Sequence, residues 1–170
     1  MKTTRVLAGC GLLVLAAVAH VQAAAYTWNS TSGGSWSDTS VGGWNTGGAY
    51  PNAEGDSATF GKAFTGGTTF TLNVADAKVG SLALNPTANI GLIINRTGDN
   101  VLTFDAAGAG PATLTWLRSP NLDGAHHNIQ APVVLNDNLV AGGGNGLTIS
   151  GPITGAGKSL TVNNSQFGLS

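Results

Sequence analysis

Short runs of alternating polar and apolar residues, each bounded by glycine, asparagine, aspartate or proline, recur along this chain from Ser57 onward. In the clearest run, residues 69–74, the alternation is strict, which is typical of a half-buried β-strand. Runs of the same kind predict further strands at residues 79–84, 90–94, 101–104, 112–116, 129–135, 146–150 and 159–162. Beyond about residue 25 no window has the spacing of an amphipathic helix, so we expect an all-β fold.

The scarcity of charge excludes several classes of protein. Only 9% of the 170 residues are charged, the formal net charge is -1, and Glu54 is the single glutamate. Helical bundles are rich in glutamate and lysine, disordered tails combine low hydrophobicity with high net charge, and nucleic-acid-binding domains carry a basic surface. None of these classes fits, and we expect no nucleic-acid partner.

The first residues have the features of a secretory signal peptide, which we place at residues 1–25. Lys2 and Arg5 precede an apolar run at residues 6–21, and Val21-Gln22-Ala23 has the pattern of a cleavage site. The run is shorter than the ~20 residues that span a bilayer, which favours cleavage over a membrane anchor. After cleavage we expect no membrane span.

Cysteine usage supports the same interpretation. Leu7-Ala8-Gly9-Cys10 looks like a bacterial lipobox, but only Val6 and Leu7 separate Arg5 from the core of the box, too little for an apolar region in front of it. Removal of residues 1–23 would remove the only cysteine of the chain. The mature protein would then depend on packing and hydrogen bonds rather than on disulfides.

Residues 26–56 form a glycine- and tryptophan-rich segment with Trp28, Trp36 and Trp44 spaced eight apart between glycine pairs. We interpret this segment as an aromatic cap that covers the open core and strand edges at the first rung of a repetitive β-structure. In the alternative interpretation, the same tryptophans are carbohydrate contacts on an exposed platform.

A degenerate repeat of Leu-Thr followed by a large apolar residue occurs at residues 102–104, 114–116, 147–149 and 160–162. Separations near 12 suit successive sides of a solenoid coil, and they also suit an antiparallel β-sandwich. Strand-flanked Asn-Gly or Asp-Gly hairpin pairs are scarce, and the apolar residues are small and β-branched, which favours the solenoid. We therefore predict β-solenoid rungs over residues 57–170, with the antiparallel sandwich as the alternative.

The order of these features resembles that of bacterial autotransporter-associated β-strand repeat proteins, in the N-terminal part of the passenger. The resemblance rests on the leader, Trp36 and Trp44 among glycines, Pro51, residues 55–60 (GDSATF), and the later stretches 129–135 and 147–157. In that family the chain usually continues through a Gly-Thr-Leu-Thr-Leu-like strand to a Thr-Tyr-Thr-Gly turn. Here residues 159–162 (SLTV) are followed by Ser170 within a few residues, and no series of barrel strands follows, which suggests a truncated passenger or a short relative.

The resemblance implies a right-handed parallel β-helix, secreted or on the outer surface of a Gram-negative-type bacterium. It implies a non-catalytic scaffold or adhesive passenger module without catalytic residues, cofactors or metals, whose partners are surface glycans or other passenger chains. A carbohydrate-binding module using Trp28, Trp36 and Trp44 is the alternative, and a polysaccharide lyase ranks last.

A lyase would need converging carboxylates and a basic residue, and the chain offers only scattered ones: Asp99, Asp105, Asp123 and Asp137 with Arg96, Arg118 or Lys158. We interpret these aspartates as turn residues. The neighbouring His126 and His127 follow Asp123, but adjacent residues of an extended chain point to opposite sides, so we expect a loop rather than a metal site.

Two glycine-rich stretches also resemble ligand-binding motifs. Residues 155–159 (GAGKS) resemble a phosphate-binding loop, but Pro152 replaces its first glycine and a strand-like run follows. Residues 142–146 (GGGNG) resemble a calcium-binding turn without any aspartate. We expect both to be turns.

Overall fold

The computed structural model describes residues 22–44, 48–88, 90–108, 110–117, 126–144, 146–163 and 167–170. These residues form sixteen strands, β1 to β16, and no helix, so the expected all-β fold is confirmed. Among the described residues there is no helix of the length and hydropathy needed to cross a membrane. Residues 1–21, which carry most of the predicted signal peptide, lie outside the described part.

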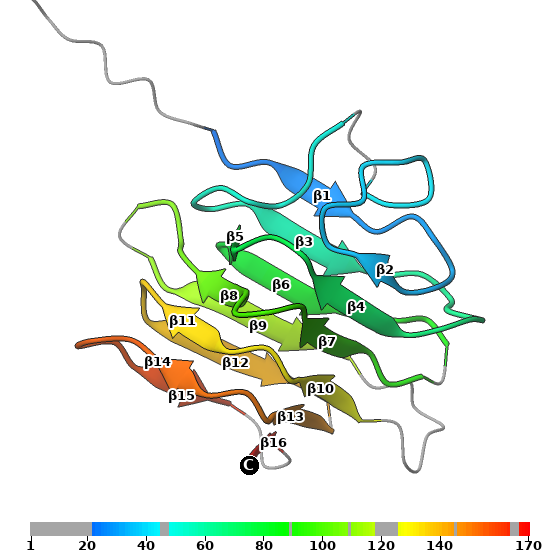
Figure 1. Ribbon diagram of the computed structural model, residues 1–170. Coiled ribbons are helices and arrows are strands. Elements are labelled where there is room, and N and C mark those ends of the chain that lie inside the picture. The colour runs from blue at the N-terminus through cyan, green and yellow to red at the C-terminus, as the bar shows by residue number, and fades with distance from the viewer. Residues whose placement is uncertain are drawn as a thin grey trace, which may run out of the picture.

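The strands form three sheets (Figure 1). Sheet I is ordered β1 (Ala25–Thr27), β3 (Ser57–Phe60), β6 (Ser81–Leu84), β9 (Ala112–Trp116), β12 (Leu139–Gly143) and β15 (Leu160–Val162). Sheet II is ordered β2 (Gly34–Ser35), β4 (Thr69–Leu72), β7 (Ile93–Arg96), β10 (His127–Ile129), β13 (Leu147–Ile149) and β16 (Phe167–Leu169). Sheet III is ordered β5 (Asp76–Val79), β8 (Val101–Phe104), β11 (Val133–Leu135) and β14 (Ile153–Thr154).

From β3 onward the chain visits sheets I, II and III in turn, and we call each such passage a circuit. Every strand lies beside the equivalent strand of the next circuit and pairs with it in parallel; Ser57 of β3, for example, faces Ser81 of β6. The antiparallel sandwich was therefore the wrong alternative. No hairpin turn joins two of the described strands, because consecutive strands belong to different sheets.

The core lies on the inward side of the sheets, where equivalent positions stack from circuit to circuit. In sheet I one such column runs through Ala58, Leu82, Leu114 and Ala141, each at most 1% exposed. Burial of one leucine side chain contributes about 1.5–3 kcal/mol, so a continuous column stabilises each circuit through its neighbours. The alternating burial of β3, β4, β5 and β6 shows the period of two that the sequence predicts.

Glycines occupy corners where successive circuits come too close for a side chain. A Cβ on Gly80 would lie 2.6 Å from the Cα of Gly55, and one on Gly151 would overlap the backbone carbonyl of Ala131. The glycine content therefore has a packing cause at these corners.

Two of the predicted strands each contain a corner between two sheets. The predicted strand at residues 79–84 is divided at Gly80 between β5 and β6, and the one at residues 129–135 is divided between β10 and β11. The predictions at 101–104 and 112–116 match β8 and β9, which lie in consecutive sheets. The repeats at 147–149 and 160–162 lie in β13 and β15, two sheets apart in the circuit, because the short β14 comes between them.

Candidate functional site

Trp28, Trp36 and Trp44 gather in one cluster at the N-terminal end of the sheets, each 1% exposed. Each indole N–H donates to a backbone carbonyl of the same segment: Trp28 to Ser32 at 2.9 Å, Trp36 to Pro51 at 2.8 Å, and Trp44 to Trp36 at 2.5 Å. Buried indoles need such acceptors, because an unpaired buried donor is costly. The segment therefore supplies both the apolar rings and their hydrogen-bond partners.

The three rings pack against one another and against the first full circuit. Trp44 lies 5.3 Å from Trp28 and 5.2 Å from Trp36, both edge to face, and its ring centroid is 5.2 Å from that of Phe60 in β3. Trp28 contacts Phe70 of β4 at 5.2 Å. The segment is also joined to the sheets, since β1 pairs with β3 and β2 with β4.

This arrangement bears directly on the two interpretations of the tryptophans. A sugar platform needs exposed indole faces, and these faces are covered by other rings. A cap needs the rings to fill the end of the core, which is where they lie. The burial thus argues against Trp28, Trp36 and Trp44 as carbohydrate contacts.

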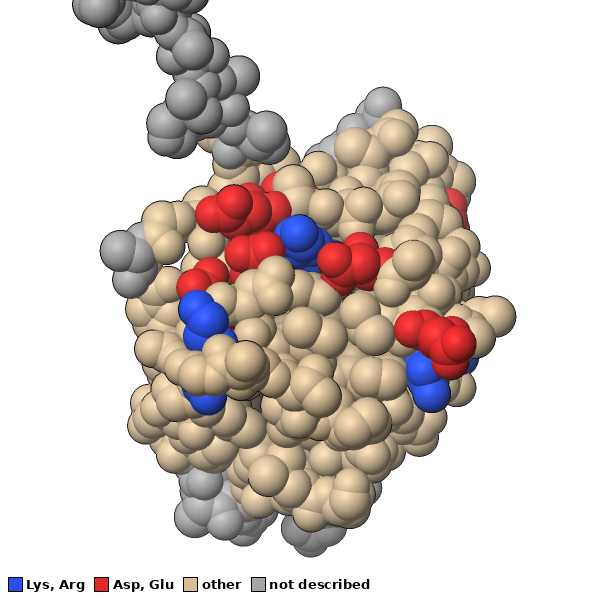
Figure 2. Space-filling view, turned by 60° about the vertical axis from the view of Figure 1, so that its left-hand side comes forward, with Lys and Arg blue, Asp and Glu red and all other residues tan. Residues whose placement is uncertain are grey.

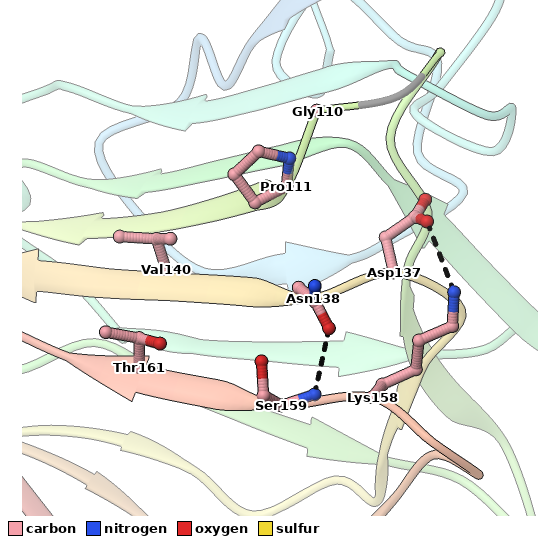
Figure 3. A pocket seen from close by; sticks show the side chains of 8 residues that line it. All are labelled: Gly110, Pro111, Asp137, Asn138, Val140, Lys158, Ser159 and Thr161. Atoms are coloured by element: carbon pink, nitrogen blue, oxygen red, sulfur yellow. Dashed lines mark hydrogen bonds and ion pairs between the residues drawn. The ribbon is translucent and has the colours of Figure 1, made fainter.

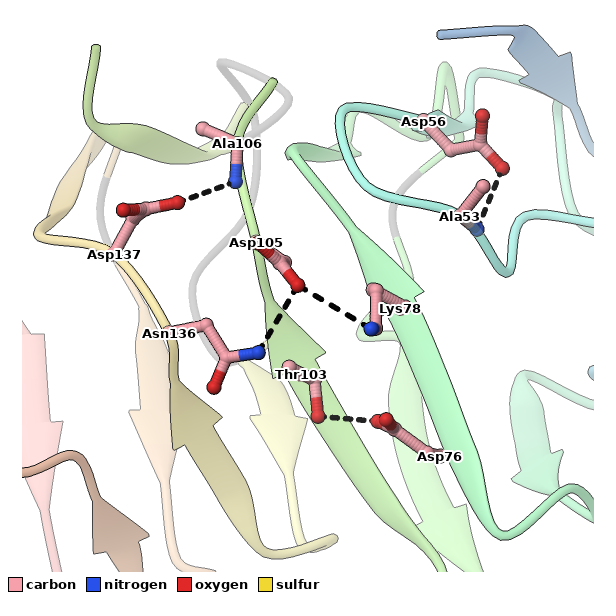
Figure 4. Close-up of polar contacts among 9 residues, drawn as sticks. All are labelled: Ala53, Asp56, Asp76, Lys78, Thr103, Asp105, Ala106, Asn136 and Asp137. Carbon is pink, nitrogen blue, oxygen red and sulfur yellow. Dashed lines mark hydrogen bonds and ion pairs between the residues drawn. The ribbon is translucent and has the colours of Figure 1, made fainter. Parts of the chain in front are cut away.

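Charged and other polar side chains gather on the outward side of sheet III and at the loops that lead from it into sheet I (Figures 2 and 4). We call this the polar corner, and its members are Asp76, Lys78, Thr103, Asp105, Asn136 and Asp137. Asp105 receives the Lys78 ammonium at 3.3 Å and the Asn136 amide at 3.0 Å, both on Oδ2, so it links three successive circuits. Thr103 donates to Asp76.

Two carboxylates, one of them in the polar corner, accept hydrogen bonds from backbone N–H groups. Asp137 accepts from the Ala106 N–H at 2.9 Å and pairs with Lys158 at 3.5 Å. Asp56 lies at the N-terminal end of the same side of the molecule and accepts from the backbone N–H groups of Ala24, Asn52 and Ala53 (Figure 4). These carboxylates fix loops between circuits.

A groove of about 440 Å³ runs along the outward side of β12 and β15 (Figure 3). It is lined by Gly110, Pro111, Asp137, Asn138, Val140, Lys158, Ser159 and Thr161. Asp137 and Lys158 neutralise each other, and Asn138 Oδ1 accepts from the Ser159 N–H at 3.0 Å. The hydroxyls of Ser159 and Thr161 bond to no other described side chain, so the groove offers neutral polar groups beside the small apolar surfaces of Pro111 and Val140.

His127 is buried in β10 with both ring nitrogens in contact with the backbone. Its Nδ1 accepts from the Leu92 N–H at 3.1 Å, and Nε2 lies 3.3 Å from the Leu117 carbonyl. The first contact requires an unprotonated Nδ1, so the proton resides on Nε2. Burial lowers the pKa of His127 below its ordinary value, and the hydrogen bond to Leu117 opposes this shift.

No protein-family model, curated protein or solved structure matches this chain. The resemblance to the autotransporter-associated repeat proteins therefore stays a prediction. The remaining candidates have to be judged from the geometry above.

That geometry disperses the residues that a lyase would need. Asp99 pairs with Arg96 at 3.7 Å on sheet II, while Asp105 and Asp137 serve the polar corner. Asp123 and Arg118 lie outside the described residues. Within the described ranges no group of three or more His, Cys, Asp or Glu side chains could hold a metal ion.

The glycine-rich candidates lie at turns and strand ends. The Lys158 N–H donates to the Gly155 carbonyl at 3.3 Å, and β15 follows at Leu160, so residues 155–159 are a turn into a strand. Residues 142–143 belong to β12, and Asn145 lies outside the described residues. The sequence did not single out Asp56 as a site residue, because an aspartate before a strand is usually a solvated turn residue.

Proposed function

We propose that this chain is a right-handed three-sided parallel β-solenoid, exported and displayed as a non-catalytic surface scaffold or adhesive module. The observation that carries the proposal is the order of the strands, since each of the three sheets is visited once per circuit with parallel pairing throughout. A circuit of roughly 20–35 residues falls within the range of solenoid repeats. The right hand follows from the strong preference of parallel crossovers.

A scaffold role agrees with how the polar side chains are used. The charged and amide side chains of the polar corner bind one another and the backbone, and they link circuits rather than converge on a cavity. The outward positions of sheet I are mainly small hydroxyl or alanine side chains, such as Thr59, Ala83 and Thr115. Such a regular, nearly uncharged surface suits a spacer or adhesive module.

Cysteine pairs on this outward face test the solenoid. Ala83 and Thr115 are direct partners on adjacent strands, so A83C/T115C should form a disulfide in the exported protein. T59C/T115C is the matched control, because β6 separates its two positions and puts them beyond disulfide reach. A bond in the control, or none in the first pair, would contradict the circuit arrangement.

Localisation tests the surface role. The full chain, expressed in a Gram-negative-type cell, should be cleaved by external protease on intact cells or be recovered in the medium. Retention of the intact leader and protection from protease in unbroken cells would contradict it.

Carbohydrate binding is a second candidate, and the groove along β12 and β15 favours it over the tryptophans. Its paired charges and free hydroxyls suit a neutral sugar better than an anion. Titration of the protein with cellohexaose and mannohexaose should shift amide NMR signals of the groove, and Thr161→Val should weaken the effect. The control Thr115→Val makes the same change on the same face outside the groove. Shifts that are absent, or unaffected by Thr161→Val, would exclude the groove as the site for these sugars.

A further inference from the structure

The carboxylate of Asp56 is buried, with only 2% of the residue exposed. Oδ1 accepts from the Ala24 N–H at 2.9 Å, and Oδ2 accepts from the N–H groups of Asn52 at 3.0 Å and Ala53 at 2.9 Å. No Lys or Arg side chain of the described residues forms an ion pair with it. A buried charge that has hydrogen bonds but no opposite charge is costly.

One of the three donors differs from the others in where it lies on the chain. The Ala24 nitrogen belongs to the Ala23–Ala24 peptide bond, directly after the Val21-Gln22-Ala23 pattern. Ala24 is held in place on its other side, because its carbonyl accepts from the Ser57 N–H at 2.8 Å. Ala23 itself is exposed. The group that touches the buried carboxylate is therefore the one that cleavage at this pattern would convert into an amine.

We propose that the Ala23–Ala24 bond is the processed bond and that the new α-ammonium group of Ala24 forms an ion pair with Asp56. The cleavage is a hydrolysis by the signal peptidase that export supplies. Water gives its oxygen to the Ala23 carbonyl carbon, which becomes a carboxylate, the C–N bond breaks, and Ala24 leaves as an ammonium. The inference rests on the proposed export, and it adds a step in which processing stabilises the folded first strands.

The structure also distinguishes this bond from a neighbouring one. Ala23-Ala24-Ala25 fits the small-residue pattern as well, and cleavage there would leave Tyr26 as the first residue. It would remove the Ala24 hydrogen bonds to Asp56 and Ser57 and the pairing of Ala25 with Ser57. Cleavage after Ala23 keeps all three and adds a charge to one of them.

The first test is the N-terminal sequence of the exported protein. The expected sequence begins Ala-Ala-Tyr-Thr, and one beginning Tyr-Thr-Trp would overturn the assignment of the bond. A chain that is exported but cleaved at another bond contradicts this inference and leaves the proposed export intact. A chain that is not exported contradicts the proposed function, and the stability test below can still be carried out.

The second test compares two purified proteins, one that begins at Ala24 with a free amine and one in which that amine is acetylated. Both keep an N–H donor for Asp56. They differ in the charge of that nitrogen and in the acetyl group, whose carbonyl takes the place of the Ala23 carbonyl. We expect the free amine to raise Tm by roughly 2–8 °C at pH 6. Equal Tm values would overturn the ion pair.

Two variants and a pH series make the comparison specific. Asp56→Asn should abolish the difference between the two proteins, whereas Asp137→Asn, which removes a comparable loop-holding carboxylate, should preserve it. If Asp56→Asn does not fold, the pH series decides. The α-amino group titrates at about 7.7–8.0 when free, and pairing raises its pKa, so the advantage should be complete below that range and lost as pH rises through the raised value.

The neighbouring titratable groups do not imitate this dependence. Burial and the charge of Asp56 raise the pKa of Tyr26. Glu54 and the Asp105–Lys78 pair, near the loop that holds Asp56, are present in both proteins and cancel in the comparison. A difference in Tm that persists unchanged above pH 10 would contradict the proposed ion pair.

Discussion

The first and last described strands differ in how completely the apolar side chains beside them are covered. At the N-terminal end, three tryptophans with about 1% exposure cover Phe60 and Phe70. At the last described strands, Leu160, Val162 and Phe167 are only half-buried, and Leu169 is 63% exposed. The inward side chains of a circuit are buried only when another layer lies on them.

The difference teaches what the glycine- and tryptophan-rich segment contributes. Its described residues add two short strands, which pair at the edges of sheets I and II, and one antiparallel bridge between Trp28 and Trp44. Its main contribution is ring volume, fixed by indole hydrogen bonds to its own carbonyls. Bulk that is anchored locally can cover a core without adding a complete circuit.

The largest expected effect comes from removing that bulk. Trp44→Ala should lower the free energy of unfolding by about 3–5 kcal/mol, since it removes a fully buried ring and leaves a cavity between Trp28 and Trp36. Phe167→Ala, at the other end, should cost less than about 2 kcal/mol, because solvent already reaches that ring. Urea unfolding of both variants measures the difference, and equal losses would contradict the difference in burial between the two rings.

The second prediction concerns the corners near the N-terminal end. Gly80→Ala places a Cβ 2.6 Å from the Gly55 backbone and should cost about 1–3 kcal/mol through overpacking. Gly67→Ala is the matched control, because nothing lies within 4 Å of its added Cβ, and it should leave stability nearly unchanged. Thermal unfolding that shows no difference between them would mean that the corner can shift outward.

The tryptophan cluster and the corner at Gly80 also show how much of the fold could be predicted from the sequence. Alternation predicted the strands that stand alone between turn residues, as at 101–104 and 112–116, because a period of two survives in any sheet. It missed the corner at Gly80, because there the chain passes from sheet III to sheet I within an apolar run, and a single glycine looks like part of the strand. The burial of the tryptophans depends on contacts between rings that lie eight or more residues apart. The spacing of the tryptophans does not show these contacts, so it could not decide between a cap and a sugar platform.

Asp56 and the groove were beyond the reach of the sequence for a related reason. The donors to Asp56 come from Ala24, Asn52 and Ala53, and the first of these is 32 residues away along the chain. The groove joins Pro111 to Lys158 through two strand pairings. Such contacts follow from the register of the circuits, which varies because the connecting loops differ in length.

A third, smaller effect concerns the middle of the sheets, where stability should depend on pH through His127 of β10. His127 is neutral when folded and its pKa is lowered by burial, so the unfolded chain binds a proton more readily. Its contribution to stability is therefore present above the ordinary histidine value of about 6.5 and is lost as pH falls below it. Tm should fall between pH 7 and pH 5 more steeply in the unaltered protein than in His127→Gln. The exposed His126→Gln is the control and should keep the steep dependence.

The smallest effect is expected from the two ion pairs of the polar corner and groove, one nearer each end. Lys78 pairs with Asp105 and Lys158 with Asp137, and the lysine side chains are 30% and 35% exposed. Pairs so open to water contribute about 0–1 kcal/mol, so Lys78→Met and Lys158→Met should each lower the free energy of unfolding by less than about 1 kcal/mol and depend on salt. Asp105 keeps its Asn136 donor and Asp137 its Ala106 donor, so neither carboxylate is left without a hydrogen bond. A loss of several kcal/mol in either variant, measured by urea unfolding at low and high salt, would mean that charge rather than ring packing makes the two ends differ.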